Sequence, residues 1–189
     1  MKIGLFFGSF NPVHIGHLII ANYMATHTDM EQVWFVVSPQ NPLKNRRNLL
    51  SEYDRLEMVN LAIEGNDKLR ASDFEFALPK PSFTIDTLVR MKEKYPQHEF
   101  VLIMGSDTVN TLPKWKNHEE IINNYPVYVY PRLNKEVVFK FDKLTICQTP
   151  MMELSATFIR RCIKNNKSIA YLVPKAVEAF LTKWGYYAS

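Results

Sequence analysis

Gly8-Ser9-Phe10-Asn11-Pro12-Val13-His14-Ile15-Gly16-His17 lies between an apolar run over 3–7 and an apolar helical pattern that begins near Leu18. This order predicts a strand, a tight turn and a helix. The first N–H groups of a helix have no partner within the helix, and the helix dipole adds partial positive charge there. Such a turn suits a phosphate. His14 and His17 stand at this point, and imidazoles donate hydrogen bonds to anionic oxygen.

A purely structural interpretation of this stretch must be weighed against a functional one. A strand, a glycine turn and a helix are common in α/β proteins, and a single buried histidine often only satisfies a neighbouring group. The whole ten-residue string favours function, because both histidines and the turn residues fall on one helix start. Its spacing fits neither the dinucleotide-binding glycine pattern nor the P-loop.

Apolar runs and helical patterns alternate along the rest of the chain. The expected strands are 2–7, 32–37, 69–76 (with a candidate break near Asp73), 99–104, 127–130 and 144–147, with 137–141 as a candidate hairpin strand. The expected helices are 15–26, 51–63, 84–94 (capped by Ser82 or Thr84), 119–124, 155–164 and one that has Pro174 as its first residue. This alternation predicts a Rossmann-like, doubly wound α/β sandwich with a mainly parallel sheet, in a single domain over 1–189.

Composition narrows the class of protein. No apolar run approaches the ~18 residues needed to cross a bilayer, and no basic leader precedes the first strand, so we expect no membrane partner. Cys147 and Cys162 lie in unrelated patterns, which favours a reduced, cytoplasmic protein. The formal charge of +4 suits small anionic substrates and is too weak to indicate nucleic acid. The sequence is compatible with an oligomer but predicts none.

A second anion-binding segment is expected at 154–161, Leu-Ser-Ala-Thr-Phe-Ile-Arg-Arg. Ser155 fits an N-cap, Ser155 and Thr157 offer hydroxyls, and Arg160 offers a planar fork for phosphate. A capped helix with solvated arginines is the structural alternative. Ligands of parallel sheets sit beyond the carboxyl ends of the strands, where 8–17, 105–107 and 151–160 are all expected. Two anion-binding helix starts at that edge favour a polyphosphate that bridges both.

These segments resemble the nucleotidyltransferase superfamily. Residues 8–17 resemble its first signature with the His-x-Gly-His core, and 154–160 resemble the second, usually Ile-Ser-Ser-Thr-x-x-Arg. Leucine replaces the isoleucine, and Ala156 replaces one serine, so this position would contribute only backbone. The segments 39–44, 82–88, 105–107 and 112–115 make the chain most similar to the bacterial nicotinate-nucleotide adenylyltransferases, and the resemblance spans essentially the whole chain.

The resemblance implies transfer of the AMP moiety of ATP to nicotinate mononucleotide, giving deamido-NAD and pyrophosphate with Mg²⁺ as cofactor. The mononucleotide phosphate would attack the α-phosphorus in line, without a covalent intermediate, so catalysis would depend on positioning and charge stabilisation. Gly8, Ser9 and Phe10 would approach ATP with their backbone. His14 and His17 would bind its phosphates, with His17 stabilising charge at the α-phosphorus.

The remaining ATP contacts implied by the resemblance come from the other two segments. Ser155, Thr157 and Arg160 would hold the β- and γ-phosphates. Gly105 and Asp107 would lie beside the adenosine, with Asp107 accepting from the ribose hydroxyls. The catalytic set would then comprise His14, His17, Arg160 and the loop residue Lys44.

The mononucleotide side has its own candidates. Lys44 would neutralise phosphate during transfer, unless it is only a solvated loop lysine. Trp115 would stack on the pyridine ring, unless it is only a core residue. The N–H groups of Thr84 and Ile85, at a helix start, would receive the nicotinate carboxylate. Arg132 would contact substrate phosphate, although Leu-Asn follows it here in place of the usual Pro-Gly.

The sequence also fits other functions. Phosphopantetheine adenylyltransferase shares both signatures but is typically shorter and lacks the context of Trp115. Nicotinamide mononucleotide is a rival acceptor, and a module that senses ATP or NAD without turnover is a rival of another class. A zinc site is disfavoured, because His14 and His17 supply only two ligands and no further Cys or His cluster completes them. No metal ligand is therefore assigned to the protein.

Overall fold

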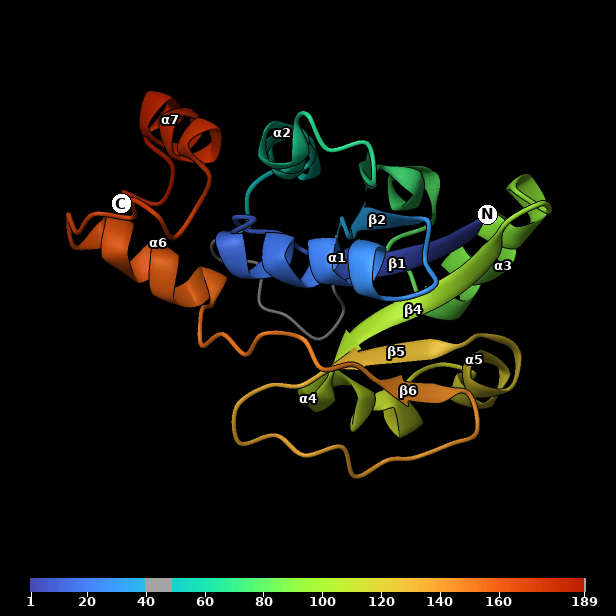
Figure 1. Ribbon diagram of the computed structural model, residues 1–189. Helices are drawn as coiled ribbons and strands as arrows, with labels where there is room; N and C mark the ends of the chain where they lie inside the picture. The colour runs from blue at the N-terminus through green and yellow to red at the C-terminus, as the bar shows by residue number, and fades with distance from the viewer. Residues whose placement is uncertain (40–48, 189) are drawn as a thin grey trace.

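Six strands form an all-parallel sheet across the centre of the protein, in this computed structural model, which describes residues 1–39 and 49–188 (Figure 1). The spatial order is β3-β2-β1-β4-β5-β6. The strands are β1 Lys2–Gly8, β2 Gln32–Val37, β3 Leu69–Ser72, β4 Glu99–Gly105, β5 Val127–Tyr130 and β6 Leu144–Ile146. The apolar runs of β1, β2 and β4 are buried on both sides, as parallel strands require. The expected Rossmann-like α/β architecture is confirmed.

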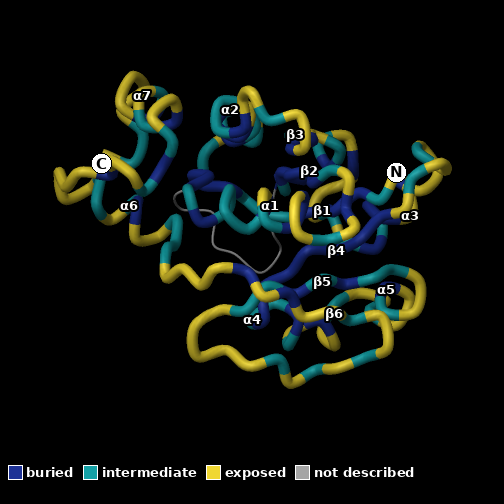
Figure 2. The backbone as a smooth tube through the Cα atoms, viewed as in Figure 1, coloured by how far each residue is buried: buried dark blue, intermediate teal, exposed yellow. Residues whose placement is uncertain are grey.

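Helices cover both faces of this sheet. They are α1 Ile15–His27, α2 Glu52–Ile63, α3 Thr84–Lys94, α4 Ser106–Val109, α5 His118–Asn124, α6 Ala156–Lys164 and α7 Lys175–Trp184, with 3₁₀ turns at Phe74–Ala77 and Leu112–Lys114. The cores separate by face: α1, α2, α6 and α7 pack on one side, and α3, α4 and α5 on the other. Figure 2 shows the buried central strands β1, β2 and β4 between these more exposed layers. Within the described residues, no helix is both long and apolar enough to pass through a bilayer.

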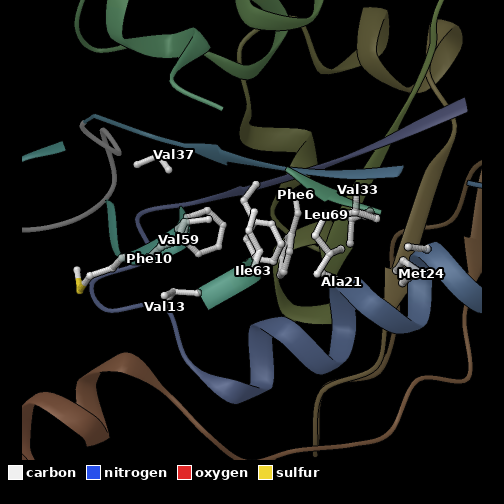
Figure 3. Packing of buried hydrophobic residues seen from close by; sticks show 14 of the residues in the cluster. Phe6, Phe10, Val13, Ala21, Met24, Val33, Val37, Val59, Ile63 and Leu69 are labelled. Carbon is white, nitrogen blue, oxygen red and sulfur yellow. The ribbon is translucent and has the colours of Figure 1, made fainter. Parts of the chain in front are cut away.

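The first of the two cores reaches the turn after β1. Phe10 and Val13 pack there with Phe6 from β1 and Val59 from α2 (Figure 3). Phe10 is only 2% exposed, and its ring lies edge-on to Phe6 with 5.8 Å between centroids. The residues beside the expected phosphate turn are therefore part of the hydrophobic core, which holds the turn in place.

The order of the strands reverses at β1. The chain passes from β1 to β2 and β3 on one side, then crosses back to β4, β5 and β6 on the other. Gly8 at the end of β1 pairs with Val37, and Phe6 pairs with Ile103 of β4. In open parallel sheets this switch point leaves a crevice beyond the carboxyl ends of the strands, which is where ligands bind.

Several local expectations are wrong. The third strand ends at Ser72, where the break near Asp73 was expected, but residues 74–76 form a 3₁₀ turn instead of more strand, because the buried carboxylate of Glu75 turns inward to accept hydroxyl hydrogen bonds. Residues 137–141 form no strand, because the side chain of Asn110 binds this backbone instead, at Glu136 O (2.7 Å) and the N–H groups of Val138 (2.8 Å) and Phe139 (3.2 Å).

Two helix starts also differ from expectation. Neither Ser82 nor Thr84 caps α3: its N-cap is Phe83, Thr84 is its first residue, and the Ser82 hydroxyl donates to Glu75 instead. Pro174 is the N-cap of α7 rather than its first residue. Both differences shift a boundary by one or two residues and leave the helices themselves as expected.

Candidate active site

A cavity of about 530 Å³ opens beyond the carboxyl ends of β1 and β5, at the switch point of the sheet. Its walls come from the turn after β1, the start of α1, the residues after β5 and the start of α6. Among the residues predicted from the sequence, the following line it: Gly8, Ser9, Phe10, His14, His17, Arg132, Ser155, Thr157 and Arg160. The fold thus brings together the two expected anion-binding segments, which are about 140 positions apart in the sequence.

The turn after β1 has little room for other side chains. A Cβ on Gly8 would lie 2.7 Å from Cζ of Phe10, so only glycine fits beneath this ring. Phe10 itself has φ +46°, in the left-handed region that bulky residues rarely adopt. Its ring is held by Phe35, with 5.3 Å between centroids, and by the His17 ring at 5.2 Å. The turn is therefore a strained but tightly packed backbone segment.

The two histidines of the first signature stack on each other at the start of α1. Their ring centroids are 3.6 Å apart, and the N–H of His14 donates to Nδ1 of His17 at 3.2 Å. Burial, together with the nearby charge of Arg132, lowers the pKa of His14 to about 4, so this imidazole is neutral at pH 7. Its Nδ1 is buried and has no hydrogen-bond partner within the described residues. His14 therefore offers the cavity an uncharged polar ring.

The start of α6 faces the turn directly. Ser155 is the N-cap of α6, and its Oγ accepts from the N–H of Phe158 at 3.2 Å. The guanidinium of Arg160 donates to the carbonyl of Asn11 at 2.7 Å and to Oγ1 of Thr157 at 3.1 Å. One arginine thus joins both segments at the mouth of the cavity, where N–H groups, hydroxyls and a fixed cation can surround an anion.

Asp107 follows β4 and lies next in sequence to Thr108, which lines the cavity. Its Oδ2 is 3.5 Å from Nη1 of Arg132, and its Oδ1 is buried without a hydrogen-bond partner in the described part of the chain. A Cβ on Gly105 would lie 2.7 Å from this Oδ1, so the glycine makes space for the carboxylate. Neither Gly105 nor Asp107 lines the cavity, although their neighbour Thr108 does.

Of the predicted mononucleotide residues, Arg132 lines the cavity, but three others lie elsewhere. Thr84, Ile85 and Trp115 are not among the lining residues of the cavity. Ile85 is 6% exposed in the core beneath α3, and Trp115 packs against the same core. Lys116 joins their two segments through an ion pair with Asp86 at 2.9 Å. These three residues form a separate group on the α3 face, and Lys44 lies outside the described residues.

Sequence reasoning missed two buried charged residues near the carboxyl edge. Arg55 on α2 is 0% exposed, and Glu75 in the 3₁₀ turn after β3 is 2% exposed. Burial raises the pKa of Glu75, although the hydroxyls of Thr87 (2.7 Å) and Ser82 (3.0 Å) donate to it. Each residue interrupts an apolar pattern in the sequence, and this interruption was the available signal that a charged side chain is buried there.

Comparison with known proteins agrees with this geometry. The chain matches the cytidylyltransferase-like family over residues 5–162. It is 53% identical over 191 residues to a "Probable nicotinate-nucleotide adenylyltransferase" of Cytophaga hutchinsonii, with 100% of both chains covered. It is 51% identical over 191 residues to a protein of the same name from Flavobacterium psychrophilum, with 99% of both chains covered.

The fold also recurs in a solved structure, Plasmodium falciparum nicotinic acid mononucleotide adenylyltransferase complexed with NaAD. The TM-score is 0.85, and the match covers 98% of this chain and 97% of that chain. At 19% sequence identity, this likeness shows a shared fold.

Proposed function

The chain belongs to the cytidylyltransferase-like family and, within it, to the nicotinate-nucleotide adenylyltransferases, and we propose from this that it transfers the AMP moiety of ATP to nicotinate mononucleotide. The products are deamido-NAD and pyrophosphate. The observation that carries the proposal is the bond from Arg160 to the Asn11 carbonyl, which joins two nucleotide-binding signatures around one cavity.

The chemistry needs positioning rather than a protein nucleophile. An oxygen of the mononucleotide phosphate forms a bond to the α-phosphorus of ATP while the bond from that phosphorus to the β-bridging oxygen breaks, and pyrophosphate leaves. The imidazoles of His14, which is neutral, and His17 donate to the phosphate oxygens, and His17 stabilises the charge that develops at the α-phosphorus. Ser155, Thr157 and Arg160 hold the β- and γ-phosphates.

Mg²⁺ belongs to the same proposal as the cofactor. No group of three or more His, Cys, Asp or Glu side chains in the described residues could hold a metal ion. We therefore place Mg²⁺ on the substrate, because Mg²⁺ keeps several waters and is usually bound through phosphate oxygens. Bound in this way, it would neutralise charge on the departing pyrophosphate.

The acceptor would bind on the α3 face. The first N–H groups of α3, at Thr84 and Ile85, would receive the nicotinate carboxylate, and the indole of Trp115 would stack on the pyridine ring. A carboxylate at a helix start is favoured over an uncharged amide, so nicotinate mononucleotide would be preferred over its nicotinamide form. Lys44 would neutralise phosphate during transfer.

Arg132 keeps its proposed contact with substrate phosphate despite the altered residues after it. Asn134 occupies the position of the usual glycine and has φ +56°, the left-handed conformation that Asn tolerates better than most residues. Lys135 donates its N–H to the Arg132 carbonyl at 3.1 Å, which closes the turn. Leu-Asn therefore forms a tight turn behind Arg132, which leaves the guanidinium at the cavity.

The test is product analysis. Purified protein with ATP, Mg²⁺ and nicotinate mononucleotide should release pyrophosphate and form deamido-NAD in equal amounts, identified by chromatography and mass. A protein that binds ATP but forms neither product is a sensor rather than a transferase. Release of pyrophosphate without deamido-NAD would show that another acceptor, such as water, is used.

A further inference from the structure

The backbone conformation of the turn over Ser9, Phe10 and Asn11 depends on contacts with other parts of the chain. Phe10 has φ +46°, and a bulky residue stays in this region only where its surroundings impose it. The Phe10 ring is buried, yet packing of the ring does not by itself fix the direction of the peptide groups on either side. Two side chains outside the cavity, Arg55 and Tyr187, bind this turn.

Arg55 on α2 binds the backbone of the turn. Its Nη1 donates to the carbonyls of Ser9 (2.8 Å) and Ser38 (2.7 Å). Its Nη2 donates to the carbonyl of Pro39 (2.9 Å), and its Nε donates to that of Leu50 (3.0 Å). The side chain is 0% exposed and forms no ion pair with any described residue. A buried guanidinium that is satisfied by four carbonyls fixes the backbone of three separate segments at once.

This contact determines the orientation of the Ser9–Phe10 peptide. In a planar trans peptide, the C=O of one residue and the N–H of the next point in opposite directions. Because the Ser9 carbonyl points at Arg55, the N–H of Phe10 points away from α2. This N–H has no backbone acceptor among the described residues, and Phe10 lines the cavity.

Tyr187, in the segment after α7, binds the same turn from another side. Its hydroxyl donates to Oδ1 of Asn11 at 2.5 Å, and the N–H of Leu50 donates to the same oxygen at 3.2 Å. Burial raises the pKa of Tyr187, so the hydroxyl stays protonated and remains a donor. The carbonyl of this Asn11 accepts the bond from Arg160. The hydroxyl of Tyr187 thus holds the side chain of Asn11, and the backbone carbonyl of the same Asn11 positions Arg160.

We propose that Arg55 and Tyr187 are positioning residues for ATP: from outside the cavity they hold the Ser9–Asn11 turn so that the Phe10 N–H and Arg160 both face the phosphates. The inference rests on the proposed function, since ATP is the ligand that the turn receives. Neither residue lines the cavity, so both act through the turn rather than by contact with the substrate.

The decisive variant is Tyr187→Phe, which removes one oxygen and leaves the ring in place. Its matched control is Tyr186→Phe, because the neighbouring hydroxyl lies near Asp54 instead of the turn. Arg55→Lys keeps the charge but cannot reach four carbonyls, and its control is Met58→Ala, a buried truncation on the same helix that leaves these bonds in place. For each protein we would measure the Kd for ATP by titration calorimetry without acceptor, kcat and both KM values, and the unfolding midpoint.

For Tyr187→Phe and Arg55→Lys we expect Kd and KM for ATP to rise by roughly ten- to 100-fold, the usual cost in an equilibrium constant when a buried hydrogen-bonding group loses its partner. The KM for the mononucleotide should change far less, and neither control variant should weaken ATP binding. Equal ATP affinity in Tyr187→Phe and wild type would overturn the role of Tyr187. An Arg55→Lys protein that loses stability but no more ATP affinity than Met58→Ala would reduce Arg55 to a structural residue. Wild type that binds ATP without turnover would refute the transferase function alone, because the calorimetric comparison would still stand.

Discussion

The backbone N–H of His14 donates to Nδ1 of His17 at 3.2 Å, and this bond settles which nitrogen of His17 carries the proton. A ring nitrogen that accepts a hydrogen bond bears no proton, so neutral His17 carries its proton on Nε2. The Phe6 and Phe10 rings stand edge-on to the His17 ring, at 5.9 Å and 5.2 Å between centroids. Nε2 of His17 is then the nitrogen that can donate, as the proposed stabilisation of the α-phosphorus requires.

Replacement of His17 by alanine should leave the fold intact and lower kcat by about 10²–10³-fold, the usual effect of removing one well-placed donor. Steady-state turnover and circular dichroism check the two halves of this prediction. His27→Ala is the matched control, because His27 is exposed in the last turn of the same helix. Near-wild-type turnover of His17→Ala would remove this residue from the mechanism.

Stability should depend on pH through His14. The folded state lowers its pKa from 6.5 to about 4, mainly by burial, so the unfolded chain binds more protons between these values. Stability from this residue is therefore complete above about pH 6.5 and is lost as the pH falls toward 4. The loss between pH 7 and pH 5 should be about 2 kcal/mol.

Urea unfolding at pH 7 and pH 5 measures this effect. The matched variant is His14→Gln, which has no titrating ring at that position while every other titrating group remains. Wild type should lose about 2 kcal/mol more than the variant over this interval. Equal losses would show that His14 titrates with an ordinary pKa in the folded protein.

The cap residue Ser155 should affect both stability and catalysis. Ser155 and Ser51 each accept a hydrogen bond at a helix start, from Phe158 N (3.2 Å) and Asp54 N (3.1 Å) respectively. Ser155→Ala and Ser51→Ala should therefore each lower the free energy of unfolding by about 1 kcal/mol. Only Ser155 lines the cavity, so only Ser155→Ala should raise the KM for ATP, which paired kinetics can check. The same KM in both variants would place Ser155 outside the ATP site.

Replacement of Trp115 should affect the KM values of the two substrates differently. Trp115→Ala should raise the KM for the mononucleotide by roughly two- to tenfold, the factor implied by aromatic stacking of about 0.5–1.5 kcal/mol. The KM for ATP should change less, because Trp115 lies on the α3 face and does not line the cavity. Trp115→Phe keeps a flat ring and should retain most of the affinity. Equal changes in both KM values would leave Trp115 with a packing role only.

Local sequence patterns predicted the parts of this protein whose structure depends on neighbouring residues. The apolar runs of β1, β2 and β4 require burial on both faces, so the parallel sheet followed directly. Ser155 was expected as a cap because the start of α6 needs an acceptor for its free N–H groups, and it is one. The meeting of both signatures at one cavity followed from the rule that parallel strands end at a common edge.

Contacts between distant segments could not be predicted in this way. Arg55 interrupts the apolar stripe of α2, but its partners are not local: only the folded chain brings it to the carbonyls of Ser9 and Ser38. Asn110 competes for the backbone of residues 137–141 from 26 or more positions away, which cancels a strand that local propensity favours. Tertiary hydrogen bonds decided both cases, and one sequence contains no direct signal for them.

The first experiment should measure pyrophosphate release by the purified protein with ATP and Mg²⁺, in separate reactions with nicotinate mononucleotide, nicotinamide mononucleotide and phosphopantetheine. Strong release with nicotinate mononucleotide, and little with the other two, is the predicted result and supports a carboxylate site at the start of α3. Release with phosphopantetheine instead would keep the phosphate cavity and refute the proposed acceptor site. No release with any acceptor, in a protein that still binds ATP, would contradict the transferase function.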